Sequence, residues 1–265
     1  MKIAISGKGG VGKTTLAGTL ARVMAADEHK VLAIDADPDA NLASALGFAR
    51  EEVVKITPFA EMTAFIEERT GAKKGTYGGM FKLNPKVDDI PERFSLCRDN
   101  LKLLVLGTIP EGGGGCYCPE SVILKYLLRH LLLQRDESII LDMEAGLEHL
   151  GRGATRGIDA FVVVVEPGSR SLQTAHQIKK LAGDLGVDQV YVVGNKVTSE
   201  EDREFILNNL GELKVLGFLD YDQEIVVADR RDQAPFEVIP RVVASVEEIY
   251  RRLEKELREN NPEKA

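Results

Sequence analysis

The feature that most constrains the fold is a glycine-rich stretch near the amino terminus, GKGGVGKTT over residues 7–15. It follows the apolar run Ile3–Ser6 and precedes a segment with helical periodicity, Thr14–Asp27. The pattern GxxxxGK[ST] between a strand and a helix is typical of a phosphate-binding loop, whose backbone N–H groups turn toward the phosphate. A chance glycine-rich turn is the alternative, and the strand–loop–helix context argues against it. We therefore expect a P-loop fold that binds ATP or ADP.

Each position of this loop has an expected role. Lys13 should reach the β- and γ-phosphates, and the Thr14 hydroxyl should bind Mg²⁺. The remaining contacts to the nucleotide should come largely from the loop backbone. The predicted nucleotide-binding residues of the loop are Gly9, Gly10, Val11, Gly12, Lys13, Thr14 and Thr15.

Apolar runs alternate with helical patterns along the chain, which predicts a doubly wound α/β fold with a mostly parallel sheet. The further predicted strands are Val31–Asp35, Leu103–Gly107, Ser138–Asp142, Phe161–Val165, Val190–Gly194 and Val215–Leu219. The further predicted helices are Pro119–Arg135, Ser171–Leu185, Glu200–Leu210 and Val246–Asn260.

Residues from about 48 to 100 interrupt this alternation. Pro58–Thr70 has the pattern of an amphipathic helix. It is followed by Gly71–Gly79, rich in glycine and lysine, and by a proline-containing stretch through Pro85 and Pro91. We interpret the segment as an insertion in a single domain spanning residues 1–265. The charged tail Glu254–Ala265 should fray.

Net charge excludes some functions. The 265 residues carry a formal net charge of −8, whereas a nucleic-acid binder needs a basic surface. The first apolar run is too short for a signal peptide, and no long apolar stretch could cross a membrane. We therefore expect a cytoplasmic protein with no nucleic-acid or membrane partner.

Carboxylates follow the second predicted strand as Asp35, Asp37 and Asp39. They would be costly in an apolar core, but beside a Mg-nucleotide they can hold the metal or order the attacking water. The alternative is a helix N-cap by Asp39 or Asn41, which we favour for Asp39.

Asp142 ends the apolar run Ser138–Asp142, the position at which a P-loop protein holds Mg²⁺ through water. A structural aspartate at a strand end is the alternative. Gly146 suits a loop that moves with the γ-phosphate.

Cys116 and Cys118 are two residues apart after four glycines. In an extended segment their side chains point the same way, so they can offer two thiolates to one metal ion. A thiolate site needs about four ligands, which two chains of a symmetric dimer would supply. Unpaired thiols, a strained disulfide and a redox dithiol are the alternatives. Cys97 stands apart and is expected to be a buried thiol.

The loop variant KGGVGKTT, with Lys8 inside it, resembles the deviant Walker A family of dimeric ATPases, which includes MinD, ParA, the nitrogenase iron protein and metal-insertion ATPases. The resemblance implies that Lys8 crosses the dimer interface to the partner's nucleotide, although spacing alone leaves it a solvated loop lysine. The match of DADP to the first switch implies that Asp37 positions the hydrolytic water and Asp35 lies on the Mg²⁺ side. Asn195, followed by Lys196, matches the base-recognition position.

A subgroup is matched more closely. The segments KGGVGKTT, DADPDAN, GGGGCYCPE and DMEAGLEHLGRG resemble the nickel-insertion accessory ATPases of carbon monoxide dehydrogenase and acetyl-CoA synthase, the CooC type. Met143 departs from the pattern, which has threonine there. The resemblance implies a slow ATPase that dimerises with ATP and holds one Ni²⁺ between Cys116 and Cys118 of both subunits for delivery to the client enzyme. Tetrathiolate chemistry also suits Zn²⁺. His149 is interpreted as a switch or interface contact.

Two other functions use the same nucleotide site. A positioning ATPase of the MinD or ParA type needs a membrane-binding tail or a basic surface, and the tail Val246–Ala265 reads as charged all round. An iron–sulfur ATPase of the nitrogenase-iron-protein type uses widely separated cysteines.

Overall fold

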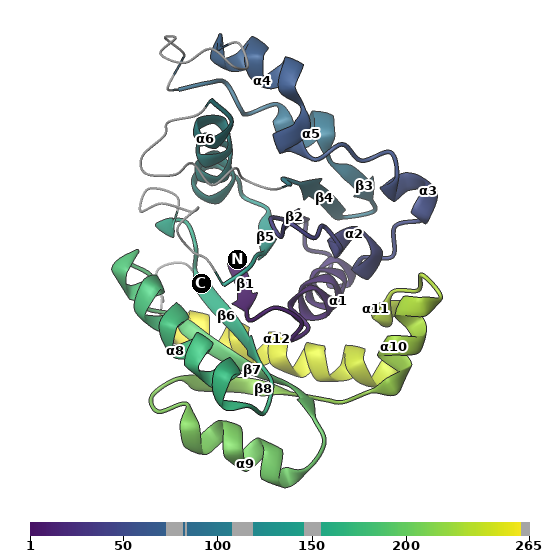
Figure 1. Cartoon of the computed structure of the whole chain (residues 1–265), viewed down its shortest axis with the longest axis vertical. Coiled ribbons are helices and arrows are strands. Elements are labelled where there is room, and N and C mark those ends of the chain that lie inside the picture. The colour runs from purple at the N-terminus through teal and green to yellow at the C-terminus, as the bar shows by residue number, and fades with distance from the viewer. Residues whose placement is uncertain (73–81, 83, 108–118, 146–154, 261–265) are drawn as a thin grey trace.

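The computed structural model describes residues 1–72, 82, 84–107, 119–145 and 155–260. Among these residues, eight strands form one sheet in the order β3-β4-β2-β5-β1-β6-β7-β8. Figure 1 shows the sheet running through the molecule with helices around it. The strands are β1 (Lys2–Gly7), β2 (Val31–Asp35), β3 (Leu96–Arg98), β4 (Leu101–Val105), β5 (Ser138–Asp142), β6 (Ala160–Val165), β7 (Val190–Val197) and β8 (Lys214–Asp220).

Every strand pair is parallel except β3 with β4. Strands β2, β5 and β6 are buried along their whole length, as the valine-rich sequence of β6 illustrates. The predicted doubly wound, mostly parallel fold is confirmed.

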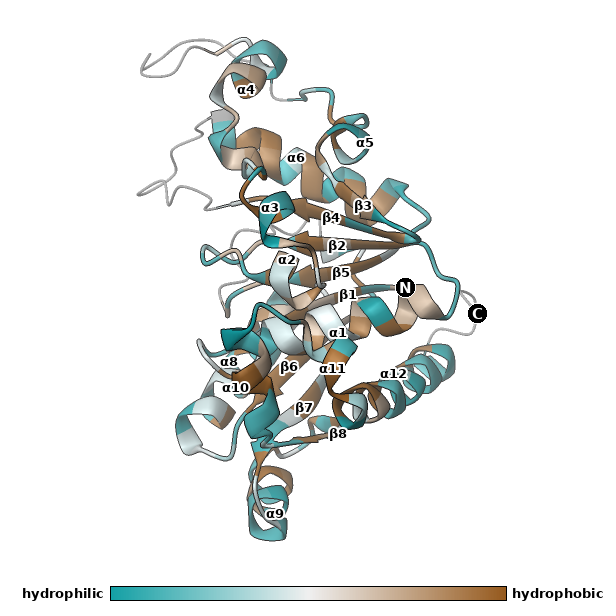
Figure 2. Ribbon diagram, turned by 90° about the vertical axis from the view of Figure 1, so that its right-hand side faces the viewer, coloured by the Kyte–Doolittle hydropathy of each residue, from teal (hydrophilic) through white to brown (hydrophobic). Residues whose placement is uncertain are grey.

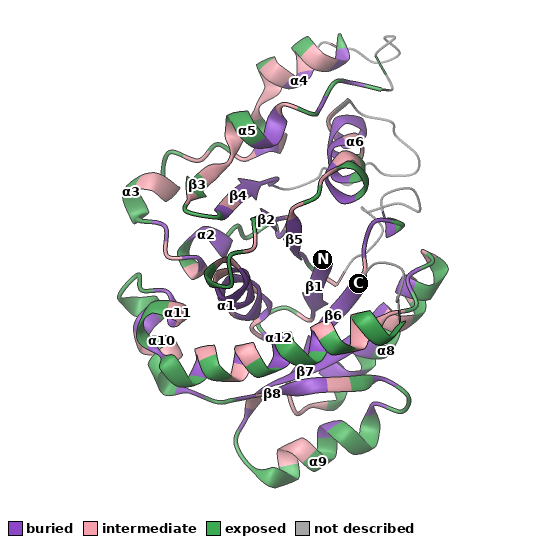
Figure 3. Cartoon of the chain, turned by 180° about the vertical axis from the view of Figure 1, so that it is seen from behind, coloured by how far each residue is buried: buried purple, intermediate pink, exposed green. Residues whose placement is uncertain are grey.

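Helices cover both faces of the sheet. The helices are α1 (Lys13–Ala26), α2 (Leu42–Ala45), α3 (Arg50–Val53), the 3₁₀ turn η1 (Phe59–Glu61), α4 (Thr63–Thr70), α5 (Ile90–Phe94), α6 (Pro119–Gln134), α8 (Ser169–Asp184), α9 (Glu200–Asn209), α10 (Gln223–Arg230), α11 (Pro235–Val238) and α12 (Pro240–Asn260). Helices α4, α5, α6, α8 and α9 contribute to one apolar core, and α1, α2, α10, α11 and α12 to the other. Figure 2 shows apolar strands between these layers, and Figure 3 shows that the strands are buried while the outer helix faces are exposed.

Several sequence expectations need correction. The helix predicted over Pro58–Thr70 is broken at Met62, whose ψ of 59° leaves the helical region between η1 and α4. The strand predicted at Leu103–Gly107 is β4, which starts at Leu101 and ends before Gly107. Gly107 has a φ of +77° and its position faces the Pro58 ring.

The C-terminal helix also differs from the expectation. It begins at Pro240 and continues to Asn260, and the residues beyond lie outside the described part of the chain. One face is apolar and buried, through Val246, Ile249 and Leu253, against α1 and β8. The prediction that this segment is charged all round was therefore wrong.

The segment from about 48 to 100 shares a core with the main sheet. Phe59, Ile66 and Ile90 are buried in the same apolar cluster as α6. These contacts support our proposal that residues 1–265 form a single domain carrying this insertion.

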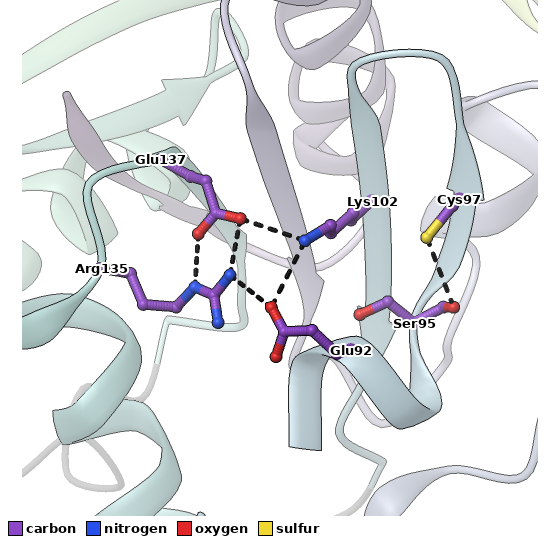
Figure 4. A network of polar contacts seen from close by, with 6 residues as sticks. All are labelled: Glu92, Ser95, Cys97, Lys102, Arg135 and Glu137. Carbon is purple, nitrogen blue, oxygen red and sulfur yellow. Dashed lines mark hydrogen bonds and ion pairs between the residues drawn. The ribbon is translucent and has the colours of Figure 1, made fainter. Parts of the chain in front are cut away.

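A charge network fastens the insertion to the sheet (Figure 4). The Arg135 guanidinium, just after α6, binds Glu137 through two hydrogen bonds and Glu92 of α5 through a third, with Nη2 2.7 Å from Oε1 of Glu92. The Lys102 ammonium of β4 lies 3.2 Å from Oε1 of Glu137. The Arg135 hydrogen bonds and the Lys102 charge lower the pKa of Glu137 from its usual 4.5 to about 2.

Candidate functional site

The glycine-rich loop joins the end of β1 to the start of α1. Gly7, Gly10 and Gly12 have φ values of 150°, 79° and 96°, a region that residues with a Cβ rarely adopt. A Cβ on Gly12 would also lie 2.2 Å from Nδ2 of Asn195. Glycine is therefore required at Gly12 both for its backbone conformation and for the close approach of a neighbouring side chain.

Two side chains at the end of β7 donate hydrogen bonds to backbone carbonyls of this loop. Asn195 donates a hydrogen bond through Nδ2 to the carbonyl of Val11 (2.7 Å), and its Oδ1 accepts from the N–H of Lys196. Lys196 has a φ of 58° and donates through Nζ to the carbonyl of Gly10 (2.6 Å). These bonds satisfy two loop carbonyls and tie the loop to β7. That Asn195 and Lys196 contact a nucleotide stays a prediction.

Lys13, at the first turn of α1, lies beside the loop that follows β2. Its side chain is 6% exposed, and Nζ is 3.6 Å from Oδ2 of Asp37, whose side chain is 12% exposed. An enclosed ammonium needs such a partner. A carboxylate therefore occupies the neighbourhood in which Lys13 is predicted to meet phosphate.

Asp35 and Asp142 end neighbouring strands. They are directly paired in the register of β2 and β5, and both are fully buried. Burial, reinforced by the charge of Asp142, raises the pKa of Asp35 to about 7, against the lowering effect of its hydrogen bond from Leu42. Burial likewise raises the pKa of Asp142 to about 6, and the Thr14 hydroxyl and Lys13 ammonium oppose that rise.

This acidic group has the character of a cation site. Among the described residues, neither carboxylate oxygen of Asp142 has a hydrogen-bond partner of full geometry, although both are buried. Asp37 and Asp142 both interact with the ammonium of Lys13, and the charges of Asp142 and Asp37 both act on Asp35. The donor set of carboxylate and hydroxyl oxygens, with Thr14 near Asp142, fits Mg²⁺, which takes further ligands from phosphate and water.

The helix N-cap expected from Asp39 or Asn41 is provided by a different residue. Asn41 precedes α2 but makes no side-chain cap, and Asp39 is exposed. Instead the N–H of Leu42, the first residue of α2, donates to Oδ2 of the buried Asp35 (2.9 Å). The expected cap was wrong because a buried carboxylate from the preceding strand already accepts that N–H.

Lys8 lies on the outer side of the loop. Its Nζ is 3.8 Å from Oε1 of Glu166, the residue that follows β6, and the other oxygen of Glu166 is 3.6 Å from Nζ of Lys196. The sequence motifs give no sign of this contact between Glu166 and Lys8. The contact joins the loops after β1 and β6, so only the pairing of these two strands could have indicated it.

The two cysteines that the sequence predicts to bind a metal ion are not among the described residues. Cys116 and Cys118 lie outside the described residues, as do Gly146 and His149. Within the described part of the chain, no three or more His, Cys, Asp or Glu side chains are grouped to hold a metal ion by themselves. The expectation that Cys97 is buried was wrong: its thiol is exposed on β3 at the sheet edge (Figure 4).

Figure 1 places the carboxyl ends of β1, β2, β5, β6 and β7, with the loops described above, on one side of the sheet. That is where doubly wound proteins bind their ligands. In the described part of the chain, no helix has the length and apolar character needed to span a membrane.

The fold and the loop define a P-loop nucleotide-binding domain, and comparison with known proteins specifies it further. The family model of the CobQ/CobB/MinD/ParA nucleotide binding domain matches residues 2–236. The chain belongs to this family.

Individual relatives fall into two groups. The carbon monoxide dehydrogenase accessory protein CooC of Rhodospirillum rubrum is 48% identical, over 91% of each chain. An uncharacterized ATP-binding protein of Methanocaldococcus jannaschii is 47% identical over 94% of this chain and 96% of its own. Among solved structures, MinD in the MinC:MinD complex of Aquifex aeolicus superposes with a TM-score of 0.68 at 21% identity, covering 96% of both chains. At 21% identity, the similarity to the Aquifex aeolicus structure shows a shared fold only.

Proposed function

We propose that this protein is an ATP-dependent metallochaperone that carries Ni²⁺ for insertion into carbon monoxide dehydrogenase or acetyl-CoA synthase. The observation that carries the proposal is the 48% identity, over 91% of both chains, to a carbon monoxide dehydrogenase accessory protein. The P-loop site and the Cys116–Cys118 pair are the two chemical features that such a role requires.

The nucleotide is ATP, and its hydrolysis uses residues grouped around the P-loop. Lys13 binds the β- and γ-phosphates, and the loop backbone from Gly9 to Thr15 encloses them. Asp37 orients the water that attacks the γ-phosphorus, and ADP leaves as the bond to its β-phosphate oxygen breaks. The enclosed Lys13–Asp37 contact supports this assignment because it places both groups at the same point.

Asp142, Asp35 and Thr14 are the residues that would hold Mg²⁺. When bound, Mg²⁺ supplies positive charge that neutralises the β- and γ-phosphates. The buried oxygens of Asp142 support the assignment, since neither has a hydrogen-bond partner of full geometry and the Thr14 hydroxyl lies beside them.

Lys8 acts across a homodimer. It is partly exposed on the outer side of the loop, where a second subunit could receive it. In this proposal Lys8 of one protomer reaches the nucleotide of the other, so that hydrolysis is slow and depends on dimerisation. Asn195 and Lys196 contribute to the base side of the pocket.

Nickel is the cargo. Two thiolates from each subunit, Cys116 and Cys118, give the four soft ligands that a thiolate site needs. Zn²⁺ suits the same ligands, so selectivity rests on loading and on the client enzyme. The protein works in the cytoplasm, with no nucleic acid or membrane as partner.

The positioning function of MinD- and ParA-type proteins has support from the family model, whose description includes both, and from fold similarity. The tail in which a membrane-binding helix would be sought is α12, whose apolar face is packed on α1 and β8. That observation favours the metallochaperone.

Transfer of nickel to a client tests the proposal. Reduced protein is loaded with Ni²⁺ and mixed with nickel-free carbon monoxide dehydrogenase in the presence of ATP, ADP or a non-hydrolysable ATP analogue. We expect CO-oxidising activity to appear with ATP and to stay at background with the Cys116→Ala/Cys118→Ala variant. Cys97→Ala is the matched control and should transfer normally. The proposal would be contradicted if CO-oxidising activity were the same with and without nucleotide, or the same with and without the protein.

A further inference from the structure

Glu166 occupies a fixed position beside the P-loop. It follows β6, which pairs with β1 in a register that sets Gly7 opposite Val164. Its backbone N–H donates to Oγ of Ser171 (3.1 Å), and Ser171 is buried at the start of α8. The carboxylate is therefore presented to the loop by an anchored backbone.

The two carboxylate oxygens face two different lysines. Oε1 lies 3.8 Å from Nζ of Lys8, and Oε2 lies 3.6 Å from Nζ of Lys196. Lys196 is held a second time by its hydrogen bond to the carbonyl of Gly10. Lys8 has no second ion-pair partner among the described residues, so it is the lysine of the two that is able to leave.

The Lys8 contact has the strength expected of a reversible one. The Lys8 and Glu166 side chains are 43% and 32% exposed. Ion pairs this exposed are weak: the paired state is favoured over the unpaired state by about two- to fivefold in population. A phosphate group carries more charge and several acceptor oxygens, so it would compete effectively for the same ammonium.

We propose that Glu166 is a positioning residue that holds Lys8 on its own protomer until ATP draws a second subunit in. The proposal rests on the proposed function, in which Lys8 acts across the dimer. Breaking the Lys8–Glu166 pair is then one of the costs of dimerisation. Glu166 thereby raises the ATP concentration at which the dimer forms. It also suppresses association of the two subunits when ATP is absent.

The resting contact can be measured without dimerisation. In nucleotide-free protein, the rate at which an amine-acetylating reagent modifies Lys8 is followed by mass spectrometry for wild type and Glu166→Gln. We expect Lys8 to be acetylated about two- to fivefold faster in Glu166→Gln, because its amine is no longer held by the carboxylate. Glu166→Asp, which keeps the charge on a shorter chain, should fall between them.

A matched control is Glu212→Gln. Glu212 makes a comparable exposed ion pair with Lys179, at 3.4 Å, away from the P-loop. Its substitution should leave the Lys8 rate unchanged. Equal Lys8 rates in wild type and Glu166→Gln would overturn the proposal.

Dimerisation is then measured separately by sedimentation over a range of ATP concentrations. Glu166→Gln should reach half-maximal dimer at about two- to fivefold lower ATP. An unchanged or higher half-point would overturn the proposal. The Lys8→Ala variant tests the proposed function separately, because there Lys8 acts across the dimer. Normal ATP-induced dimerisation of Lys8→Ala would rule out that role, whatever the acetylation rates show.

Discussion

The ammonium of Lys13 lies 3.6 Å from Oδ2 of Asp37, and both side chains are almost enclosed. This contact joins the P-loop to the loop after β2. A phosphate bound at Lys13 would replace Asp37 as the ion-pair partner of the ammonium, which leaves the Asp37 carboxylate free to bind water. The pair therefore connects nucleotide binding to the group that we expect to orient the hydrolytic water.

Asp37→Asn should separate binding from hydrolysis. The amide keeps the shape but loses the charge that orients water, so kcat for ATP should fall by about 100-fold or more. The ATP affinity should be equal or tighter, since Lys13 no longer has a competing carboxylate. Phosphate release and nucleotide titration measure the two quantities. Asp39→Asn, at an exposed neighbour, is the control and should turn over normally; wild-type kcat in Asp37→Asn would remove Asp37 from this role.

Gly12→Ala should lose nucleotide binding. The alanine would need a φ near +96° and its Cβ would press on Nδ2 of Asn195. We expect a loss of about 1–3 kcal/mol in the free energy of unfolding and at least a tenfold weaker affinity for ADP, roughly the size of such backbone strain. Calorimetric titration and urea unfolding measure both. Gly183→Ala on α8, where a Cβ meets nothing within 4 Å, should be neutral or slightly stabilising.

Asn195→Ala tests the residue that braces the loop and is predicted to read the base. Removing its amide leaves the carbonyl of Val11 without its side-chain donor, which should cost about 1–2 kcal/mol of stability. If the same amide also contacts adenine, the preference for ATP over GTP should fall. Competition binding with both nucleotides gives the ratio, with Asn209→Ala on α9 as the control. An unchanged ratio with lower stability would restrict Asn195 to bracing.

Glu137 should make stability depend on pH in the acid range. Its pKa is about 2 in the folded protein and 4.5 as its ordinary value, so the folded state binds its proton more weakly than the unfolded state. The stabilisation is therefore complete above about pH 4.5 and is lost as the pH falls toward 2. Glu137→Gln should be about 1–3 kcal/mol less stable at pH 7, a difference that shrinks below pH 4.5. Urea unfolding from pH 7 to 3.5 measures it. Glu259→Gln, in an exposed pair with Lys255, should show almost no difference at any pH.

The sequence predicts the sheet well because its strands are continuous apolar runs with glycine-rich or acidic ends. The short edge strand β3 and the short helices α3 and α5 escaped prediction, since so few residues give no periodicity to detect. Pro91 illustrates the difficulty: read as a sign of irregular structure, it lies in the first turn of α5, where proline is tolerated.

The candidate site was predictable one residue at a time, and its connections were not. The motifs indicated Lys13, Asp35, Asp37 and Asp142, because Lys13 begins a helix, Asp35 and Asp142 end strands, and Asp37 follows Asp35 by two residues. The capping of α2 by Asp35 and the contact of Glu166 with Lys8 depend on which strands are neighbours. Local spacing carries no such information, and neither could be read from a single motif.

In the proposed function, two copies of the chain hold one metal ion through Cys116 and Cys118. The most direct measurement is an anaerobic titration of the reduced protein with Ni²⁺ and with Zn²⁺, in which the ultraviolet thiolate charge-transfer bands and the sedimentation coefficient are followed together. We expect one metal ion per dimer, unchanged in Cys97→Ala and abolished in Cys116→Ala/Cys118→Ala. Absence of metal uptake, or uptake that persists in the double variant, would contradict it.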